Sequence, residues 1–148
     1  RAETVTTASA LLKQTKLTPE VRNEALYFRA KALLAEGQKQ EALADLMALA
    51  KDTRNVYGAE AKYLVAQTYF DEGETAKAEK EVLDYIEVST PHAYWLARSF
   101  VLLSDVYVKL GRKMEAKQYL LSLQQNYQAN DDIAGMIESR LAKLKSVK

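Results

Sequence analysis

One sequence pattern occurs three times in this chain of 148 residues and constrains its fold more than any other feature. Each copy has a large apolar residue four positions before a glycine, an alanine five positions after it, and an aliphatic residue four positions after that alanine. The three copies read LLAEGQKQEALADL, YFDEGETAKAEKEV and YVKLGRKMEAKQYL. Their glycines are Gly37, Gly73 and Gly111, so the pattern has a period of 36 and then 38 residues. A period of this size predicts a repeat protein in which each copy supplies one structural unit.

Apolar residues at spacings of three, four and seven flank every glycine, as Leu26, Ala30 and Leu33 do before Gly37. Such spacings place the residues on one face of an α-helix. A glycine between two such runs ends the first helix at low cost because it readily adopts a left-handed backbone conformation. Each unit is therefore predicted to be a helix, a tight turn and an antiparallel helix.

The sequence predicts an all-α fold of eight helices. They are expected at residues 3–15, 19–36, 39–52, 56–72, 75–88, 91–110, 113–127 and 131–146. These helices form one domain over residues 1–148, with a half unit at 3–15, units at 19–52, 56–88 and 91–127, and a closing helix at 131–146. Hydroxyl–proline pairs at Thr18–Pro19 and Thr90–Pro91 favour two of the helix starts. Because one hairpin cannot bury its own apolar face, neighbouring hairpins must stack into an α-solenoid.

Charge and composition argue against several functions. The formal net charge is +1, whereas nucleic-acid-binding proteins usually carry a basic excess. No stretch approaches the roughly 18 apolar residues that a membrane-spanning helix needs. Cysteine is absent, which excludes disulfides and thiolate metal sites and leaves the redox compartment undetermined. Since the chain opens at Arg1 rather than at methionine, we expect it to be a fragment of a longer protein.

No residue pattern in the chain indicates catalysis or a cofactor. His92 is the one histidine and follows Pro91, where a helix cap or a loop residue is the expected role. The carboxylates mostly fall beside lysines on the polar sides of helices, as expected for solvated surfaces. Glycine-rich phosphate loops are absent. We therefore predict no catalytic, metal-binding or cofactor-binding residues and do not expect an enzyme.

These units resemble the tetratricopeptide repeat, whose signature is a Trp-x-x-Leu-Gly-x-x-Tyr run, an Ala-x-x-x-Phe step and a proline. Tyr69 and Tyr107 keep the tyrosine place, and Ala42, Ala78 and Ala116 keep the alanine place. The phenylalanine place is aliphatic in all three copies, and the period exceeds the about 34 residues of the family. The resemblance implies a right-handed superhelix whose concave groove is lined by the first helix of each unit.

The resemblance also implies which side chains line that groove, one turn before and after the buried small residue of each unit. These candidates are Glu24, Tyr27, Lys31, Leu34, Glu60, Tyr63, Gln67, Phe70, Arg98, Val101, Asp105 and Val108. Tyr27 and Tyr63 occupy matching places in successive units and suit contact with an extended peptide or a partner helix. The alternative, that the next helix covers these rings and makes them part of the core, stays open.

A protein-interaction module that binds a peptide or helix in the groove is the function that this resemblance implies. The family's carboxylate clamp for Hsp70 or Hsp90 is not expected, because Leu64 and Leu102 stand where the clamp needs hydrogen-bonding side chains and only Arg98 fits. A structural spacer in a larger protein and an accessory domain of a fused enzyme are the alternatives. The partner's identity cannot be read from the sequence.

The long repeat period is also similar to that of bacterial cell-envelope proteins, such as outer-membrane assembly lipoproteins and Tol–Pal-associated factors. That similarity favours a location in the bacterial envelope or periplasm. Residues 3–15 look like the second half of a unit whose first half is missing, which would leave an apolar face uncovered. Self-association through such an uncovered end is therefore a further expectation.

Overall fold

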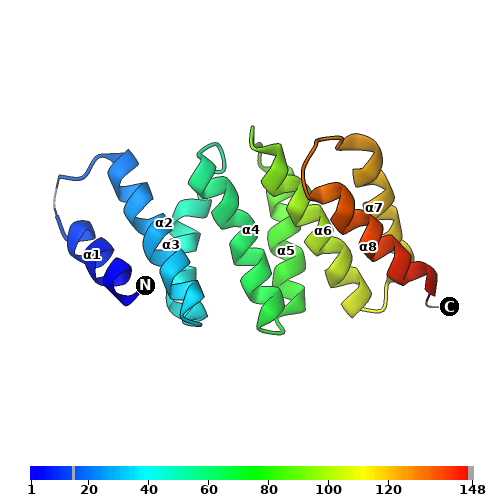
Figure 1. Cartoon of the computed structure of the whole chain (residues 1–148), viewed down its shortest axis with the longest axis horizontal. Coiled ribbons are helices and arrows are strands. Elements are labelled where there is room, and N and C mark those ends of the chain that lie inside the picture. Colours follow the sequence, from blue (N-terminus) through cyan, green and yellow to red (C-terminus); the bar gives the residue numbers. More distant parts are fainter. Residues whose placement is uncertain (15, 147–148) are drawn as a thin grey trace.

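The computed structural model describes residues 1–14 and 16–146, and in those ranges the chain forms eight α-helices and no strand (Figure 1). The helices are α1 (Ala2–Leu12), α2 (Pro19–Ala35), α3 (Lys39–Ala50), α4 (Val56–Asp71), α5 (Thr75–Glu87), α6 (Ala93–Lys109), α7 (Lys113–Asn126) and α8 (Ile133–Ser146). Each helix packs against the next one along the chain. The predicted all-α solenoid of antiparallel hairpins is therefore confirmed, while the sense of its superhelical turn and the division into units stay predictions.

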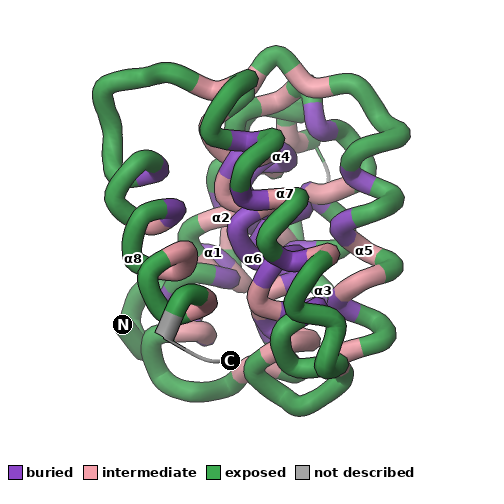
Figure 2. The backbone as a smooth tube through the Cα atoms, turned by 90° about the vertical axis from the view of Figure 1, so that its right-hand side faces the viewer, coloured by how far each residue is buried: buried purple, intermediate pink, exposed green. Residues whose placement is uncertain are grey.

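The helices lie in two layers, and the buried residues gather between them (Figure 2). In one layer α2 contacts α4, α4 contacts α6, and α6 contacts α8. In the other layer α3, α5 and α7 make no such contacts with one another within the described residues. The closer spacing of α2, α4, α6 and α8 makes their layer the inner one. We call the surface of these four helices the first-helix face.

The three turn glycines adopt nearly the same backbone conformation, with φ of 79°, 79° and 78° at Gly37, Gly73 and Gly111. In the first turn the Gln38 N–H donates to the Leu33 carbonyl at 2.8 Å, and equivalent bonds of 2.8 and 2.7 Å close the other two. This is the Schellman arrangement, which a left-handed residue makes possible at a helix end. The pattern of a large apolar residue four positions before a glycine therefore recurs because it forms this turn: the apolar residue supplies the accepting carbonyl, and the glycine adopts the left-handed conformation.

Small residues let the helices approach closely inside and between units. Ala30 and Ala42, which lie on the two helices joined by the first turn, are both fully buried. Gly58 lies where α4 passes the end of α3, and a Cβ added there would lie 1.9 Å from the carbonyl oxygen of Asp52. Any side chain at this position would force the two helices apart.

Thr18 and Thr90, both predicted to cap helices, have different roles. The Thr18 hydroxyl accepts the Val21 N–H at 3.2 Å and caps α2 as predicted. The Thr90 hydroxyl accepts the N–H of His92 at 3.1 Å and also donates to the carbonyl of Thr53 at 2.6 Å, which ties together two loops from successive units. Helix α6 begins at Ala93 and not at residue 91.

Two other helix bounds differ from those predicted. The first helix ends at Leu12 rather than at residue 15, a position outside the described residues. The last helix begins at Ile133 rather than at residue 131, because the Asp131 carboxylate accepts the Ile133 N–H at 2.9 Å just before the first helical turn. The remaining predicted bounds agree with the observed ones to within two residues.

Candidate functional site

The twelve predicted groove residues lie on α2, α4 and α6. Glu60, Tyr63 and Val101 are buried, Glu24, Lys31 and Val108 are exposed, and Tyr27, Leu34, Gln67, Phe70, Arg98 and Asp105 are half-buried. The set is therefore divided between side chains that hold neighbouring helices together and side chains that a partner could reach.

At the junction of α2 and α4, three of the predicted residues bind one another. The Tyr27 hydroxyl donates to one oxygen of the Glu60 carboxylate at 2.8 Å, and the Lys31 ammonium donates to the other at 2.8 Å. The Tyr27 ring also lies 4.5 Å from the Tyr57 ring, centroid to centroid. Burial, together with the hydrogen bond to Glu60, raises the pKa of Tyr27 to about 12. These contacts join α2 to α4.

At the junction of α4 and α6, the matching tyrosine is covered by the next first helix. Tyr63 is 7% exposed, and its hydroxyl donates to Gln67 at 2.9 Å. The ring of Trp95 lies 5.7 Å from the Tyr63 ring, and the Arg98 guanidinium lies 5.2 Å from it. Burial raises the pKa of Tyr63, although the nearby Arg98 charge opposes that shift. Tyr63 thus belongs to the α4–α6 contact.

At the junction of α6 and α8, an ion pair replaces the aromatic contacts. Arg140 of α8 donates two hydrogen bonds to the Asp105 carboxylate, at 2.8 and 2.9 Å. Such a bidentate pair fixes the orientation of both side chains. Val101, at the place of the two tyrosines, is 2% exposed and packs with Ile133 and Ile137 of α8.

The first-helix face is hollowed beside this third junction, by about 490 Å³ between α4, α6, α7 and α8. We call this space the C-terminal hollow. Its apolar lining includes Phe70, Val108 and Leu144. Phe70 and Val108 are predicted groove residues, and Val108 is 41% exposed. Among the twelve candidates these two, with Asp105, are therefore the ones that line the C-terminal hollow.

The charges around the C-terminal hollow are mostly positive. Lys109, Lys113, Arg140 and Lys143 lie in its lining, whereas Asp105 is the single acidic residue there. The Asp105 carboxylate already accepts two hydrogen bonds from Arg140. A partner segment with a carboxylate beside a bulky apolar side chain would complement this lining in both charge and polarity.

The basic residues of the C-terminal hollow are absent from the predicted groove. Arg140 and Lys143 are visible in the sequence as cations near the end of the last helix, a place where the helix dipole alone favours them. Lys109 and Lys113 flank a turn and show no periodic pattern. A search for cations on neighbouring helix ends could have found them, but only with knowledge of how α8 packs.

Within residues 1–14 and 16–146, no group of three or more histidine, aspartate or glutamate side chains could hold a metal ion. His92 directly precedes α6, and its Nε2 lies 2.9 Å from the carbonyl oxygen of Arg54, so its ring joins two loops. None of the helices in the described part of the chain has the length and apolar character needed to cross a bilayer.

Comparison with known families gives one result. Residues 97–129, which cover most of α6, all of α7 and the loop that follows, match the model of the tetratricopeptide repeat family. No curated protein and no solved structure matches the chain. The match confirms the tetratricopeptide resemblance predicted from the sequence, and it falls on the unit whose helices line the C-terminal hollow.

Proposed function

Since this chain contains a tetratricopeptide repeat, a kind of unit that typically serves protein–protein interaction without catalysis, we propose that it binds a segment of another protein on its first-helix face. The C-terminal hollow is the observation that carries this proposal. It lies on the first-helix face, and its lining combines apolar side chains with an excess of positive charge. The bound segment is an acidic peptide or helix that inserts a bulky apolar side chain.

We assign different roles to four of the twelve candidate residues. Phe70 and Val108 contact the partner, because both line the C-terminal hollow. Tyr27 and Tyr63 instead set the distance between successive first helices, since the next helix covers each ring.

Charge reversal at Lys109 and Lys113 tests the proposal. Both side chains are exposed, so the double change to glutamate should leave the melting temperature nearly unchanged. Partner capture from the native host by the full-length protein should fall at least about tenfold, because the acidic segment would then meet two like charges. The matched control reverses Lys80 and Lys117, which are exposed on α5 and α7, and it should capture partners as the wild type does. Equal capture by both double variants would refute the C-terminal hollow as the site.

A structural spacer within a larger protein is the second candidate, and the α2–α4 junction favours it. There the predicted groove side chains are tied to one another rather than turned toward a ligand. A spacer would retain no partner through the C-terminal hollow, so the same charge reversal separates the two functions.

A further inference from the structure

A small polar pocket lies next to the C-terminal hollow on the first-helix face, between α4, α6 and α8. It shares Asp105 and Arg140 with the hollow, and its lining also includes Tyr63, Gln67 and Arg98. We call it the Arg98 pocket. Its volume of about 130 Å³ is several times the roughly 30 Å³ that a water molecule occupies in the liquid. The pocket therefore has room for a group as large as a carboxylate.

Arg98 is a half-buried cation without an acidic partner. Its guanidinium donates a hydrogen bond to the Tyr94 hydroxyl at 3.1 Å. It also lies over two aromatic rings, 5.2 Å from the centroid of Tyr63 and 5.9 Å from that of Trp95. Within residues 1–14 and 16–146, no carboxylate forms an ion pair with it. Neutral groups thus hold Arg98 in place and leave its charge uncompensated.

A comparison of repeat positions explains why Arg98 has no acidic partner on α4. Arg98 stands thirteen residues before its turn glycine, as Glu60 does in the preceding unit. Glu60 is paired with Lys31, which stands six residues before its own turn glycine. On α4 that second place is occupied by Gln67, which carries no charge. The acidic residue of the pair has been replaced by a basic one, and its neighbour has not become acidic in compensation.

The first helix on the other side of α6 does not supply an opposite charge either. Helix α8 contributes Arg140 to the lining, and Arg140 already donates two hydrogen bonds to Asp105. The pocket thus contains two cations and one carboxylate, and that carboxylate is engaged. A charge that is partly withdrawn from water costs free energy unless an opposite charge compensates it. An anion bound beside Arg98 would provide this compensation.

The geometry favours a carboxylate over other anions. A guanidinium stacked on aromatic rings is fixed in orientation, and its planar array of N–H groups matches a carboxylate in two parallel hydrogen bonds. A phosphate group brings about two negative charges, and its second charge would be repelled by Asp105 in the same lining. Leu102 also lines the pocket and cannot donate a hydrogen bond to the backbone beside a terminal carboxylate. A side-chain carboxylate within a segment is the anion that fits.

We propose that Arg98 binds the carboxylate of an aspartate or glutamate side chain in the partner segment, while the adjoining C-terminal hollow takes the bulky apolar side chain of the same segment. The identity of the ligand as a protein segment rests on the proposed function. The carboxylate site itself is a property of the Arg98 pocket and can be tested separately from the hollow.

The probe for this site is N-acetylglutamate amide, which carries a side-chain carboxylate and no other charge. Trp95 is the only tryptophan of the chain, so its indole N–H gives a unique signal in a two-dimensional proton–nitrogen NMR spectrum. Titration of the full chain should shift this signal saturably. N-acetylglutamine amide, which is uncharged, should cause no shift. N-acetylglutamine has the same atoms with the carboxylate at the chain end, and it should bind severalfold more weakly.

Variants of two stacked arginines assign the binding to Arg98. Arg98→Gln should weaken binding of N-acetylglutamate amide at least about tenfold, because a charge-assisted hydrogen-bonded pair is lost. Arg98→Lys keeps the charge without the planar array and should weaken binding about threefold, even if Arg98→Gln also lowers stability. The matched control is Arg112→Gln. Arg112 also stacks on a tyrosine, Tyr107, but is paired with Glu115, so this change should leave binding unaltered.

Three results would overturn the proposal: no saturable shift with N-acetylglutamate amide, equal binding to wild type and Arg98→Gln, or tighter binding of N-acetylphosphoserine amide. Charge reversal of Lys109 and Lys113 should change binding of the small probe by no more than about twofold, since these charges lie outside the pocket lining. The same reversal lowers partner capture if the C-terminal hollow is the protein-binding site. Failure of the carboxylate site and failure of the proposed function are therefore distinguishable.

Discussion

At the centre of the stack, Tyr27 and Lys31 of α2 donate hydrogen bonds to the Glu60 carboxylate of α4. At the N-terminal end, Glu24 has the same repeat position in α2 as Glu60 has in α4, but it is exposed. The two carboxylates have the same repeat position and the same chemistry. They differ in whether a preceding first helix lies against them. A repeat position therefore fixes which groups a side chain can bind, and the presence of a neighbouring helix decides whether those groups are within reach.

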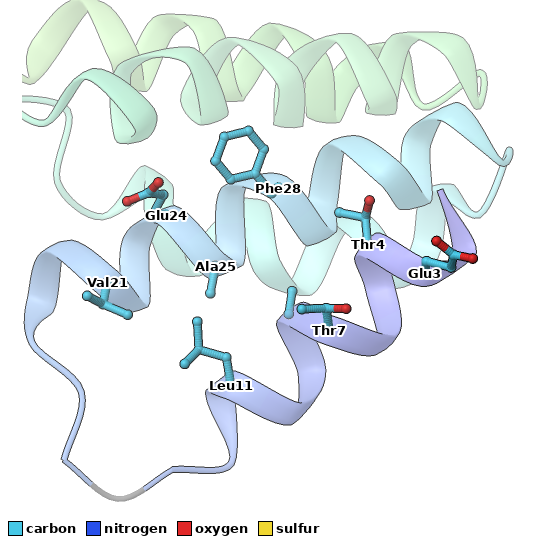
Figure 3. A pocket seen from close by; sticks show the side chains of 9 residues that line it. Glu3, Thr4, Thr7, Leu11, Val21, Glu24, Ala25 and Phe28 are labelled. Carbon is cyan, nitrogen blue, oxygen red and sulfur yellow. The ribbon is translucent and has the colours of Figure 1, made fainter.

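At the C-terminal end, two successive first helices are also joined by an ion pair, but the order of the charges is reversed. There the position of Lys31 is taken by Asp105, whose partner Arg140 comes from α8. Basic side chains gather beside this pair in the C-terminal hollow, whereas the groove between α1 and α2 is lined by the acidic Glu3 and Glu24 (Figure 3). The centre of the stack is thus expected to contribute mainly to stability, and the C-terminal hollow to offer a surface for a partner.

The largest effect predicted for the centre is that of Gly58→Ala. Its added Cβ would lie 1.9 Å from the Asp52 carbonyl oxygen, and backbone atoms cannot move away as a flexible side chain can. We expect a loss of about 4 kcal/mol or more in the free energy of unfolding, measured by urea denaturation.

Gly135→Ala is the matched control at the C-terminal end. An added Cβ at Gly135 would meet nothing within 4 Å, and alanine is the better helix former by about 1 kcal/mol. This variant should therefore be as stable as the wild type or slightly more stable. Equal effects of the two glycine substitutions would show that the α3–α4 approach is not as close as the structure has it.

A medium-sized effect is predicted for Leu102→Ala, compared with Phe28→Ala at the same repeat position. Leu102 is 2% exposed, so its truncation should cost about 3 kcal/mol of unfolding free energy. Phe28 is 48% exposed, and its truncation should cost about 1 kcal/mol or less. Urea denaturation of both variants measures the difference. Similar costs at the two positions would mean that another protein segment covers Phe28, in the groove between α1 and α2, in solution.

Much of this fold could be predicted from the sequence because its determinants are local. A glycine at positive φ, helical spacing of apolar residues and a hydroxyl cap each act within a few residues, as Gly37 and Thr18 do. Thr90 was predicted to cap a helix that starts at residue 91, whereas α6 begins at Ala93 and the Thr90 hydroxyl also binds Thr53, a residue of another loop. Local patterns carry no information on such a contact.

The candidate site was less accessible to prediction for the same reason. Spacing places Tyr63 toward the next unit, but it cannot show that Trp95 and Arg98 lie over its ring. It also places Phe70 on the side of α4 that faces the predicted groove, without showing that Arg140, far along the chain, lines the same hollow as Phe70. Which face a side chain points to is a property of its helix, whereas what covers that face depends on how the helices stack.

The smallest effect predicted is that of Tyr27→Phe, which tests whether the central junction works as a hydrogen-bonded contact. The change removes the hydroxyl that Glu60 accepts at 2.8 Å and leaves the ring in place. Glu60 keeps its bond from Lys31, so the loss at neutral pH should be about 1 kcal/mol in urea denaturation.

The pH dependence of Tyr27→Phe gives this test a second readout. In the folded chain the pKa of Tyr27 is raised from 10.0 to about 12 by burial and by the bond to Glu60. The unfolded chain therefore loses this proton first, and the stability of the wild type should fall as the pH rises from 10 toward 12. Phenylalanine has no proton to lose, so the variant should lose less stability over that range. If both proteins lost stability equally, the hydroxyl would be facing water, and Tyr27 would be as open to a partner as Glu24.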